Sequence, residues 1–198
     1  MSQFFSAAPK TLHRRQFLQI TAAVGAVALA GGMLTPALTP AATTVQVAQT
    51  LMGTRVHLTV SAPERQSAQR AITTTLAAMT RLITFFDHLQ PASPLATLNR
   101  NGALDDAPTE LLDVLQRAIT FGELTGGAFD VTVKPLLDAR QAGADPTALR
   151  HLVDFRQITL TGQQVRLRIP GAAITLDGIA KGRVIDGGIE ALHHLGFD

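Results

Sequence analysis

The spacing of hydrophobic residues changes period several times along this 198-residue chain, and this change constrains the fold more than any single motif. Around M-G-T, residues 44–60 form two alternating runs, with Val56, Leu58 and Val60 on one face. This pattern predicts a β-hairpin. Over residues 64–86 the period becomes three to four, which predicts an amphipathic helix. Its inner face would carry Ile72, Leu76, Met79, Ile83 and Phe86.

The rest of the chain continues this mixture of periods. Residues 85–101, with two prolines, are predicted as a loop, and residues 131–154 favour no single structure. Four further elements are predicted: a helix from Pro108 to about Thr125 with Leu112, Leu115 and Ile119 inward, a hairpin over 157–169, a strand over 172–176 and a helix over 179–195. Hairpins and helices without strict alternation predict an α+β fold with mixed or antiparallel sheets and packed helices.

The first 42 residues have the composition of an export signal. They contain three basic residues and no acidic one, and their apolar stretch at 20–34 is short for a membrane span. Paired arginines at 14–15, with Phe17 and Leu18 after them, indicate the twin-arginine route of bacteria. We therefore predict residues 1–42 as the signal and 43–198 as one domain. An uncleaved N-terminal anchor is the alternative.

Charge and composition exclude several classes of protein. The chain has 17 basic and 15 acidic residues, and the signal removes three basic ones, so 14 basic residues face 15 acidic ones. A domain with this balance and no basic stripe is not expected to bind nucleic acid. The chain contains no cysteine, which excludes disulfides, thiol nucleophiles and cysteine–zinc sites. The histidines have no metal-binding spacing, and residues 43–198 suffice for one hydrophobic core.

The stretch T-L-D-G-I-A-K-G, residues 175–182, places two glycines and a lysine where a strand gives way to a helix. Glycine at a helix N-terminus lets the backbone approach a ligand, and the exposed N–H groups favour an anion. Lys181, one turn in, would add a positive charge, and the arrangement suits a diphosphate. The alternative is that Gly178 and Gly182 only let the helix pack tightly on its sheet. The residues alone leave both open.

A second stretch, T-G-G-A-F-D-V-T at 125–132, joins a helix end to an aromatic–acidic pair. The glycines are typical of helix capping. Phe129 would offer its face to an aromatic ring, and Asp130 would accept a hydrogen bond from a ribose or a ring N–H. The alternative is a core phenylalanine beside a turn-forming aspartate. A third stretch, S-P-L-A-T-L-N at 93–99, indicates little by itself.

Taken together and in this order, these stretches resemble the ApbE-type FAD:protein FMN transferases. The resemblance runs from L-M-G-T at 51–54 to L-D-G-I-A-K-G-R-V-I-D at 176–186, and covers essentially all of residues 43–198. Four motifs in the family's order make it specific, although no single motif does. The resemblance implies an ApbE-like fold and a transferase. Such an enzyme takes FMN from FAD with Mg²⁺, attaches it to a threonine of a target protein and releases AMP.

The resemblance also implies site residues, although it names no catalytic side chain. Met52 would contact the flavin, and the backbone carbonyl of Gly178 would be one Mg²⁺ ligand. The residues expected to bind FAD are Met52, Ala128, Phe129, Asp130, Thr175 (where many relatives have Asp) and Lys181. The implied partner is an acceptor protein with a reactive threonine. We expect the protein to contact a membrane only through its export signal or through a membrane-bound acceptor. The expected localisation is periplasmic or exported, and anchoring to the inner membrane is an open alternative.

Three departures from the family pattern qualify this interpretation. Leu89 stands where relatives often carry an aromatic FAD contact, and Pro94 stands where the motif has an acid. The family's remaining Mg²⁺ ligands lie in a C-terminal part beyond the last helix of this sequence. We therefore expect a chain truncated at its C-terminus, with uncertain activity. The rival interpretations are an exported FAD-binding carrier without transferase activity and an inactive fragment.

Overall fold

The computed structural model describes residues 42–197, so residues 1–41 of the predicted export signal lie outside the described part. The helices and strands run in the order β1 Thr43–Leu51, β2 Thr54–Ala62, α1 Arg65–Phe86, α2 Pro94–Asn101, β3 Ala103–Leu104, α3 Thr109–Leu124, α4 Lys134–Gln141, β4 Ile158–Thr161, β5 Gln164–Leu167 and α5 Ala180–His194. Short 3₁₀ helices cover Thr147–Leu152 and Phe155–Gln157. The strands form two antiparallel sheets, β1-β2 and β3-β5-β4, which confirms the α+β prediction.

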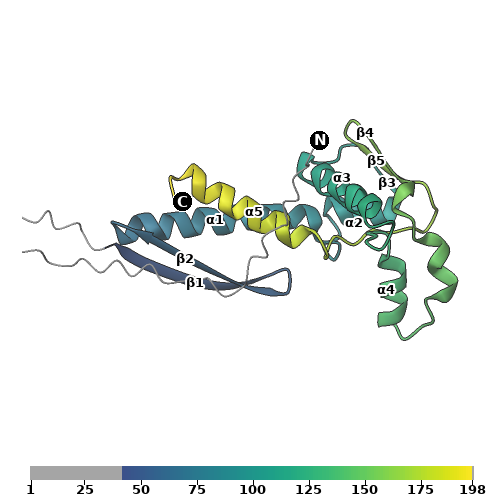
Figure 1. Cartoon of the computed structure of the whole chain (residues 1–198), viewed down its shortest axis with the longest axis horizontal. Coiled ribbons are helices and arrows are strands. Elements are labelled where there is room, and N and C mark those ends of the chain that lie inside the picture. Colours follow the sequence, from purple (N-terminus) through teal and green to yellow (C-terminus); the bar gives the residue numbers. More distant parts are fainter. Residues whose placement is uncertain (1–41, 198) are drawn as a thin grey trace, which may run out of the picture. The chain divides into compact units, whose positions relative to one another are not determined.

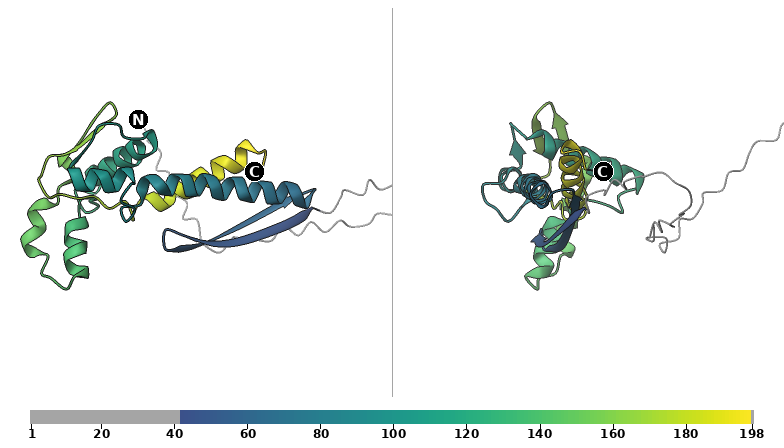
Figure 2. Two further views of the ribbon diagram at one scale, coloured as in Figure 1. Left: turned by 180° about the vertical axis from the view of Figure 1, so that it is seen from behind. Right: turned by 90° about the vertical axis from the view of Figure 1, so that its left-hand side faces the viewer.

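The N-terminal hairpin packs against helix α1. Strands β1 and β2 pair over their full length, from Thr43 opposite Ala62 to Leu51 opposite Thr54. Helix α1 contacts both strands, and two views of the ribbon show it running beside them (Figures 1 and 2). A small apolar cluster lies in this contact, formed by Val45, Val60, Ala62, Ala68, Ala71 and Ile72. Both predicted elements are therefore confirmed.

Helix α5 lies beside α1 at a close approach made by two glycines. A Cβ atom added at Gly187 would lie 2.2 Å from Leu82 Cδ1, and one at Gly188 would lie 3.0 Å from Met79 Cγ. Contacts this short leave no room for a methyl group without displacing the side chains of α1. Tight helix packing is one explanation that the sequence pattern allows for Gly182. A Cβ atom added at Gly182 would meet nothing within 4 Å, so no close packing explains this glycine.

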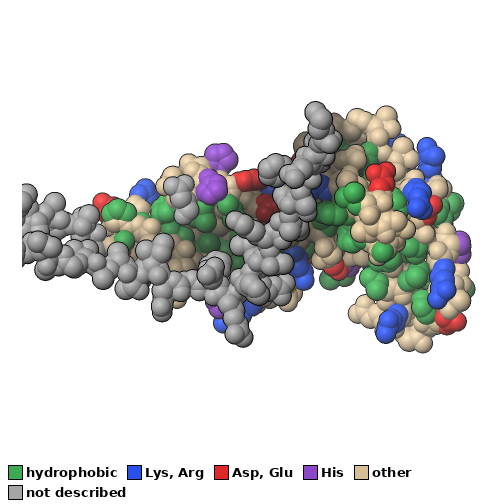
Figure 3. All heavy atoms as spheres, viewed as in Figure 1, with side chains coloured by type: hydrophobic (Ala, Val, Ile, Leu, Met, Phe, Trp, Pro, Cys, Tyr) green, Lys and Arg blue, Asp and Glu red, His purple; other side chains and the backbone are tan. Residues whose placement is uncertain are grey.

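The larger core joins α1, α2, α3 and α5 to the sheet β3-β5-β4. Its fully buried large side chains include Phe86, Leu95, Leu98, Leu111, Leu115, Phe155, Val165, Ile174 and Leu176. Helices α2 and α3 contact this sheet, and α1 and α5 reach the same core from the hairpin side. Figure 3 shows hydrophobic side chains at the surface of the described chain, interspersed with polar and charged ones. Among residues 42–197, no helix combines the length and hydropathy that a membrane span requires.

The structure corrects three sequence predictions. Residues 85–101 are not all loop, because Ser93 and Pro94 begin α2 with an N-cap and a proline in the first turn. Residues 172–176 form no strand of a sheet and make a single parallel bridge, between Val133 and Ala173. On α3, Leu112 and Ile119 are only half-buried. The buried face carries Leu111, Val114, Leu115 and Ala118.

Candidate functional site

The turn before α5 leaves backbone groups open to a ligand. The carbonyl oxygen of Leu176 accepts hydrogen bonds from the N–H groups of Ile179 (2.9 Å) and Ala180 (2.7 Å), which closes the turn. Gly178 is exposed, and within residues 42–197 its carbonyl oxygen accepts no hydrogen bond. Lys181 is the second residue of α5, rather than one turn in as predicted, and its side chain is exposed. The first N–H groups of such a helix favour an anion.

Phe129 lies against Gly178, so two stretches far apart in the sequence meet here. A Cβ atom added at Gly178 would lie 3.3 Å from Phe129 Cε2. Gly178 does not have a positive φ, so its backbone conformation is open to other residues and the restriction comes from Phe129. Phe129 is half-buried and packs edge-on to Phe121, with ring centroids 6.0 Å apart. One edge of Phe129 therefore borders the turn before α5.

Met52 occupies a strained position at the tip of the N-terminal hairpin. Its φ is 48°, the only positive value among non-glycine residues in the described chain, and Gly53 follows with φ 68°. Two positive φ values in a two-residue loop are the signature of a type I′ turn, where asparagine is the common first residue. A methionine in this conformation costs about 1 kcal/mol or more. Strained positions of this kind cluster at functional sites, so the half-buried Met52 is a candidate for a ligand contact.

Met52 and Lys181 line a common cavity of about 520 Å³, which we call the α5 cavity. Asp177 from the turn before α5 lines it too, as do residues from α1 and the loop that follows, namely Ile83, Phe86, Asp87, His88 and Leu89. The cavity thus collects apolar side chains, a cation and three residues with titratable side chains besides the lysine. The apolar side chains suit an aromatic part of a ligand and Lys181 suits an anionic part, while Asp87 and Asp177 bring two acidic groups to the same lining.

Five of the residues expected at the site do not line the α5 cavity, namely Ala128, Phe129, Asp130, Thr175 and Gly178. Ala128 is exposed in the turn after α3. Asp130 Oδ1 accepts from the N–H (2.8 Å) and hydroxyl (2.6 Å) of Thr132, while Oδ2 accepts from the Phe155 N–H (2.9 Å). Thr175 is buried, and its hydroxyl accepts from the Asp177 N–H at 3.3 Å. Asp130 and Thr175 therefore hold the backbone around the site in this arrangement.

The described residues offer little to a metal ion. No group of three or more His, Asp or Glu side chains within residues 42–197 could hold one. The Gly178 carbonyl oxygen fits a partial role because Gly178 is exposed and this oxygen accepts no hydrogen bond from the described residues. Magnesium commonly takes few protein oxygens and completes its shell with phosphate and water. This part of the chain would thus contribute one ligand.

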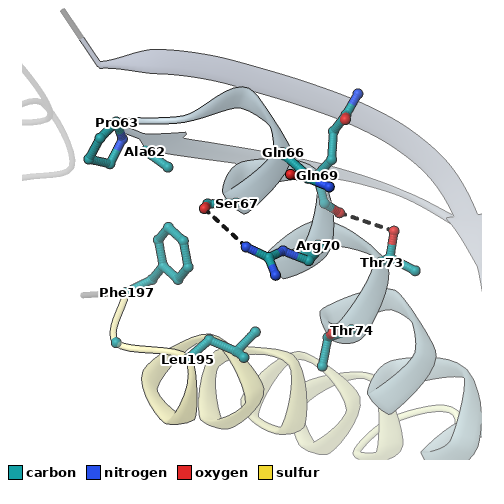
Figure 4. Close-up of a pocket in the computed structure, with 11 residues that line it drawn as sticks. Ala62, Pro63, Gln66, Ser67, Gln69, Arg70, Thr73, Thr74, Leu195 and Phe197 are labelled. Carbon is teal, nitrogen blue, oxygen red and sulfur yellow. Dashed lines mark hydrogen bonds between the residues drawn. The ribbon is translucent and has the colours of Figure 1, made fainter. Parts of the chain in front are cut away.

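A larger cavity, of about 810 Å³, lies at the other end of α5 and contains none of the predicted site residues. It is bordered by Ala62 and Pro63, the start of α1, and Leu195 and Phe197 (Figure 4). Arg70 is its one basic lining residue, and the Arg70 guanidinium points to Ser67 Oγ at 3.4 Å. Size alone does not make it the site, because none of the residues expected to bind a ligand lies here and the lining apart from Arg70 is uncharged.

Sequence reasoning missed the cavity residues Asp87 and His88 and the role of Asn99. The Asn99 side chain hydrogen-bonds the backbone of Ile174, directly before the turn. The serine–proline pair at 93–94 was the available signal, because Ser at an N-cap and Pro in the first turn together predict a helix that would carry Asn99. The pairing with Ile174, 75 residues away, had no local signal.

Comparisons with known proteins identify a family and an export signal. The sequence model of the ApbE family matches residues 52–198, a span that contains the four stretches except Leu51 at the start of the first. The model of twin-arginine translocation pathway signal sequences matches residues 11–31. No curated protein matches the sequence.

Solved structures share the fold. The ApbE protein of Thermotoga maritima has 23% identity and a TM-score of 0.68, over 77% of this chain and 53% of that one. The flavin transferase ApbE of Vibrio cholerae has 23% identity and a TM-score of 0.68, over 78% and 55%. The flavinyl transferase ApbE of Pseudomonas stutzeri, in its apo form, has 18% identity and a TM-score of 0.66, over 79% and 52%. This chain spans about half the length of each structure.

Proposed function

The chain belongs to the ApbE family, and on that premise we propose that it forms part of a flavin transferase that moves FMN from FAD to a protein. Two of the similar solved structures are named as flavin or flavinyl transferases. The observation that carries the proposal is the meeting of four separate stretches at the start of α5. Met52 and Lys181 line one cavity, Phe129 borders Gly178, and Asn99 holds Ile174.

Each part of this arrangement has a use for FAD. The α5 cavity offers the apolar Met52 side chain to a flavin ring and Lys181 to a phosphate. The first N–H groups of α5 add partial positive charge on the side of the turn. When bound at Gly178 and phosphate, Mg²⁺ would draw negative charge from the transferred phosphoryl group. These contacts hold and orient the dinucleotide before any bond changes.

The proposed reaction is a phosphoryl transfer. A threonine hydroxyl oxygen of the acceptor protein forms a bond to the FMN phosphorus, and the bond from that phosphorus to the bridging oxygen of AMP breaks. The hydroxyl proton passes to a base or to solvent, and AMP leaves with the electron pair. Positioning and charge stabilisation are the main contributions of a protein to such a transfer.

The place of action follows from the signal. A twin-arginine signal match at residues 11–31 supports export, and we propose the periplasm as the destination. The acceptor would be an exported protein or the periplasmic part of a membrane protein. We propose residues 1–42 as the signal and residues 43–198 as the part that binds FAD.

The decisive experiment incubates the 198-residue chain with FAD, Mg²⁺ and an acceptor protein that carries an exposed threonine. Flavin fluorescence on the denatured acceptor, together with AMP release, would support transfer. Reversible FAD binding without transfer would support the carrier function instead. Failure to bind FAD, in a chain that shows a cooperative thermal transition, would contradict both functions.

Lys181→Met tests the ligand role of the cation. The substitution keeps most of the side-chain stem and removes the charge, so it should weaken FAD binding by about 1–3 kcal/mol with little change in folding stability. Arg70→Met, at the larger cavity, is the matched control and should leave the dissociation constant for FAD unchanged. Equal losses in both variants would contradict the assignment of the α5 cavity, as would unfolding by Lys181→Met with unaltered affinity of the folded fraction.

A further inference from the structure

We propose that Asn99 is a positioning residue that sets the turn at residues 177–181, and that α2 braces the α5 cavity from two sides. The stretch S-P-L-A-T-L-N, which forms most of α2 and its N-cap, contains no residue expected to contact FAD, and the proposed chemistry gives it no part. Its two polar anchors nevertheless bind backbone at or near the cavity. Ser93 binds Asp87, which lines the cavity, and Asn99 binds Ile174, three residues before the lining residue Asp177. The inference rests on the proposed function for the identity of the ligand.

The Asn99 side chain acts as a strand neighbour for Ile174. Asn99 Nδ2 donates to the Ile174 carbonyl oxygen at 2.8 Å, and the Ile174 N–H donates to Asn99 Oδ1 at 2.7 Å. One residue of an antiparallel neighbour would exchange the same pair of bonds. The two bonds together also determine the orientation of the amide, because the reversed amide would place donor against donor.

The segment held by Asn99 has few other anchors. On its other side, Thr175 N–H donates to the Val131 carbonyl oxygen at 2.9 Å, and Ala173 bridges to Val133. Ile174 is fully buried, so its N–H and carbonyl would find no water in place of Asn99. Leu176, two residues on, closes the turn into α5 through its carbonyl oxygen. The Asn99 pair therefore determines where this turn begins.

The N-terminal end of α2 holds Asp87, which lines the α5 cavity from the side of α1. Ser93 Oγ donates to the Asp87 carbonyl oxygen at 2.6 Å and accepts from the Ala96 N–H at 2.9 Å, which caps the helix. Asp87 comes from the loop after α1 and lines the α5 cavity together with Asp177 and Lys181. A shift of α2 would thus move both contributors, and a rigid α2 keeps their spacing.

The test compares Asn99→Leu with two controls in the full chain. Leucine has a similar volume and makes no hydrogen bond. Asn101→Leu repeats the substitution at an exposed position of the same helix, and Val165→Ala weakens the core through β5. Amide hydrogen exchange of residues 174–181 and the dissociation constant for FAD are measured for each. Asn99→Leu should speed that exchange and weaken FAD binding, each about tenfold or more, since two buried hydrogen bonds are lost.

The controls separate positioning from stability. Val165→Ala should lower the melting temperature by several degrees, without a selective increase in amide exchange at residues 174–181 and without a change in FAD affinity. Asn101→Leu should match the unaltered protein in all three measurements. Asn99→Asp keeps the acceptor for the Ile174 N–H but sets a carboxylate oxygen against the Ile174 carbonyl oxygen, so it should loosen residues 174–181 at least as much as Asn99→Leu.

Two results would overturn the inference. One is exchange at 174–181 that rises no more in Asn99→Leu than in Val165→Ala. The other is unchanged FAD affinity in Asn99→Leu although the unaltered protein binds FAD. If the unaltered protein binds no FAD while Asn99→Leu still loosens residues 174–181, the proposed function fails and the brace itself is supported.

Discussion

Helix α5 and the turn before it carry glycines in two places, and these glycines differ in what surrounds them. At Gly187 and Gly188 an added Cβ would crowd the side chains of Leu82 and Met79 on α1, so a larger residue there would have to displace them. At Gly182 an added Cβ would meet nothing, and at Gly178 it would meet only the edge of Phe129. The middle of the helix uses glycine to bring two helices together. Its beginning uses glycine where the protein itself leaves space, which is what a ligand site requires.

The comparison predicts its largest effect at Gly187. Gly187→Ala should lower the free energy of unfolding by about 1–3 kcal/mol, because the methyl group overpacks the contact with Leu82. Urea denaturation measures this loss.

Gly182→Ala is the matched control in the same helix. It should raise the free energy of unfolding by up to about 1 kcal/mol, because alanine is the better helix former and no neighbour opposes it. Equal responses of the two variants would contradict the division of α5 into a packed and an open part.

A second, intermediate effect is expected at Gly178. Gly178→Val should weaken FAD binding at least about tenfold, because the branched side chain would crowd both Phe129 and the open carbonyl group. Gly178→Ala should be mild, since φ is ordinary and the half-buried Phe129 ring can yield by a few tenths of an ångström. FAD titration at several Mg²⁺ concentrations measures both variants. A loss for alanine as large as for valine would mean that the space itself, rather than access to the carbonyl oxygen, is what matters.

The smallest expected effect is at Met52, on the hairpin side of the α5 cavity. Met52→Asn should stabilise the protein by about 1 kcal/mol, because asparagine tolerates the positive φ that strains methionine. The same variant should bind FAD more weakly, since an apolar flavin contact is lost. Thermal unfolding and FAD titration measure the two changes. Stabilisation without loss of affinity would exclude Met52 from the flavin contact and leave its strain unexplained.

Local spacing in the sequence determines much of the secondary structure of this protein. The two hairpins, helix α1, the end of α3 and the helix that follows Gly178 are predictable from periodicity and turn residues, because those signals lie within a few residues of one another. The family is also readable at this level, since the order of the four motifs marks it.

Contacts between distant residues decided the rest. Residues 172–176 look like a strand by composition, yet their partner on one side is the amide of Asn99, 75 residues earlier. Gly182 and Gly187 are alike in sequence, and only the position of Leu82 on α1 distinguishes them. Asp130 is expected from the resemblance to bind FAD, and only the folded structure shows that its carboxylate accepts hydrogen bonds from Thr132 and Phe155. The sequence determines which chemical groups each side chain carries, but the packing of the whole chain determines which residues each side chain contacts.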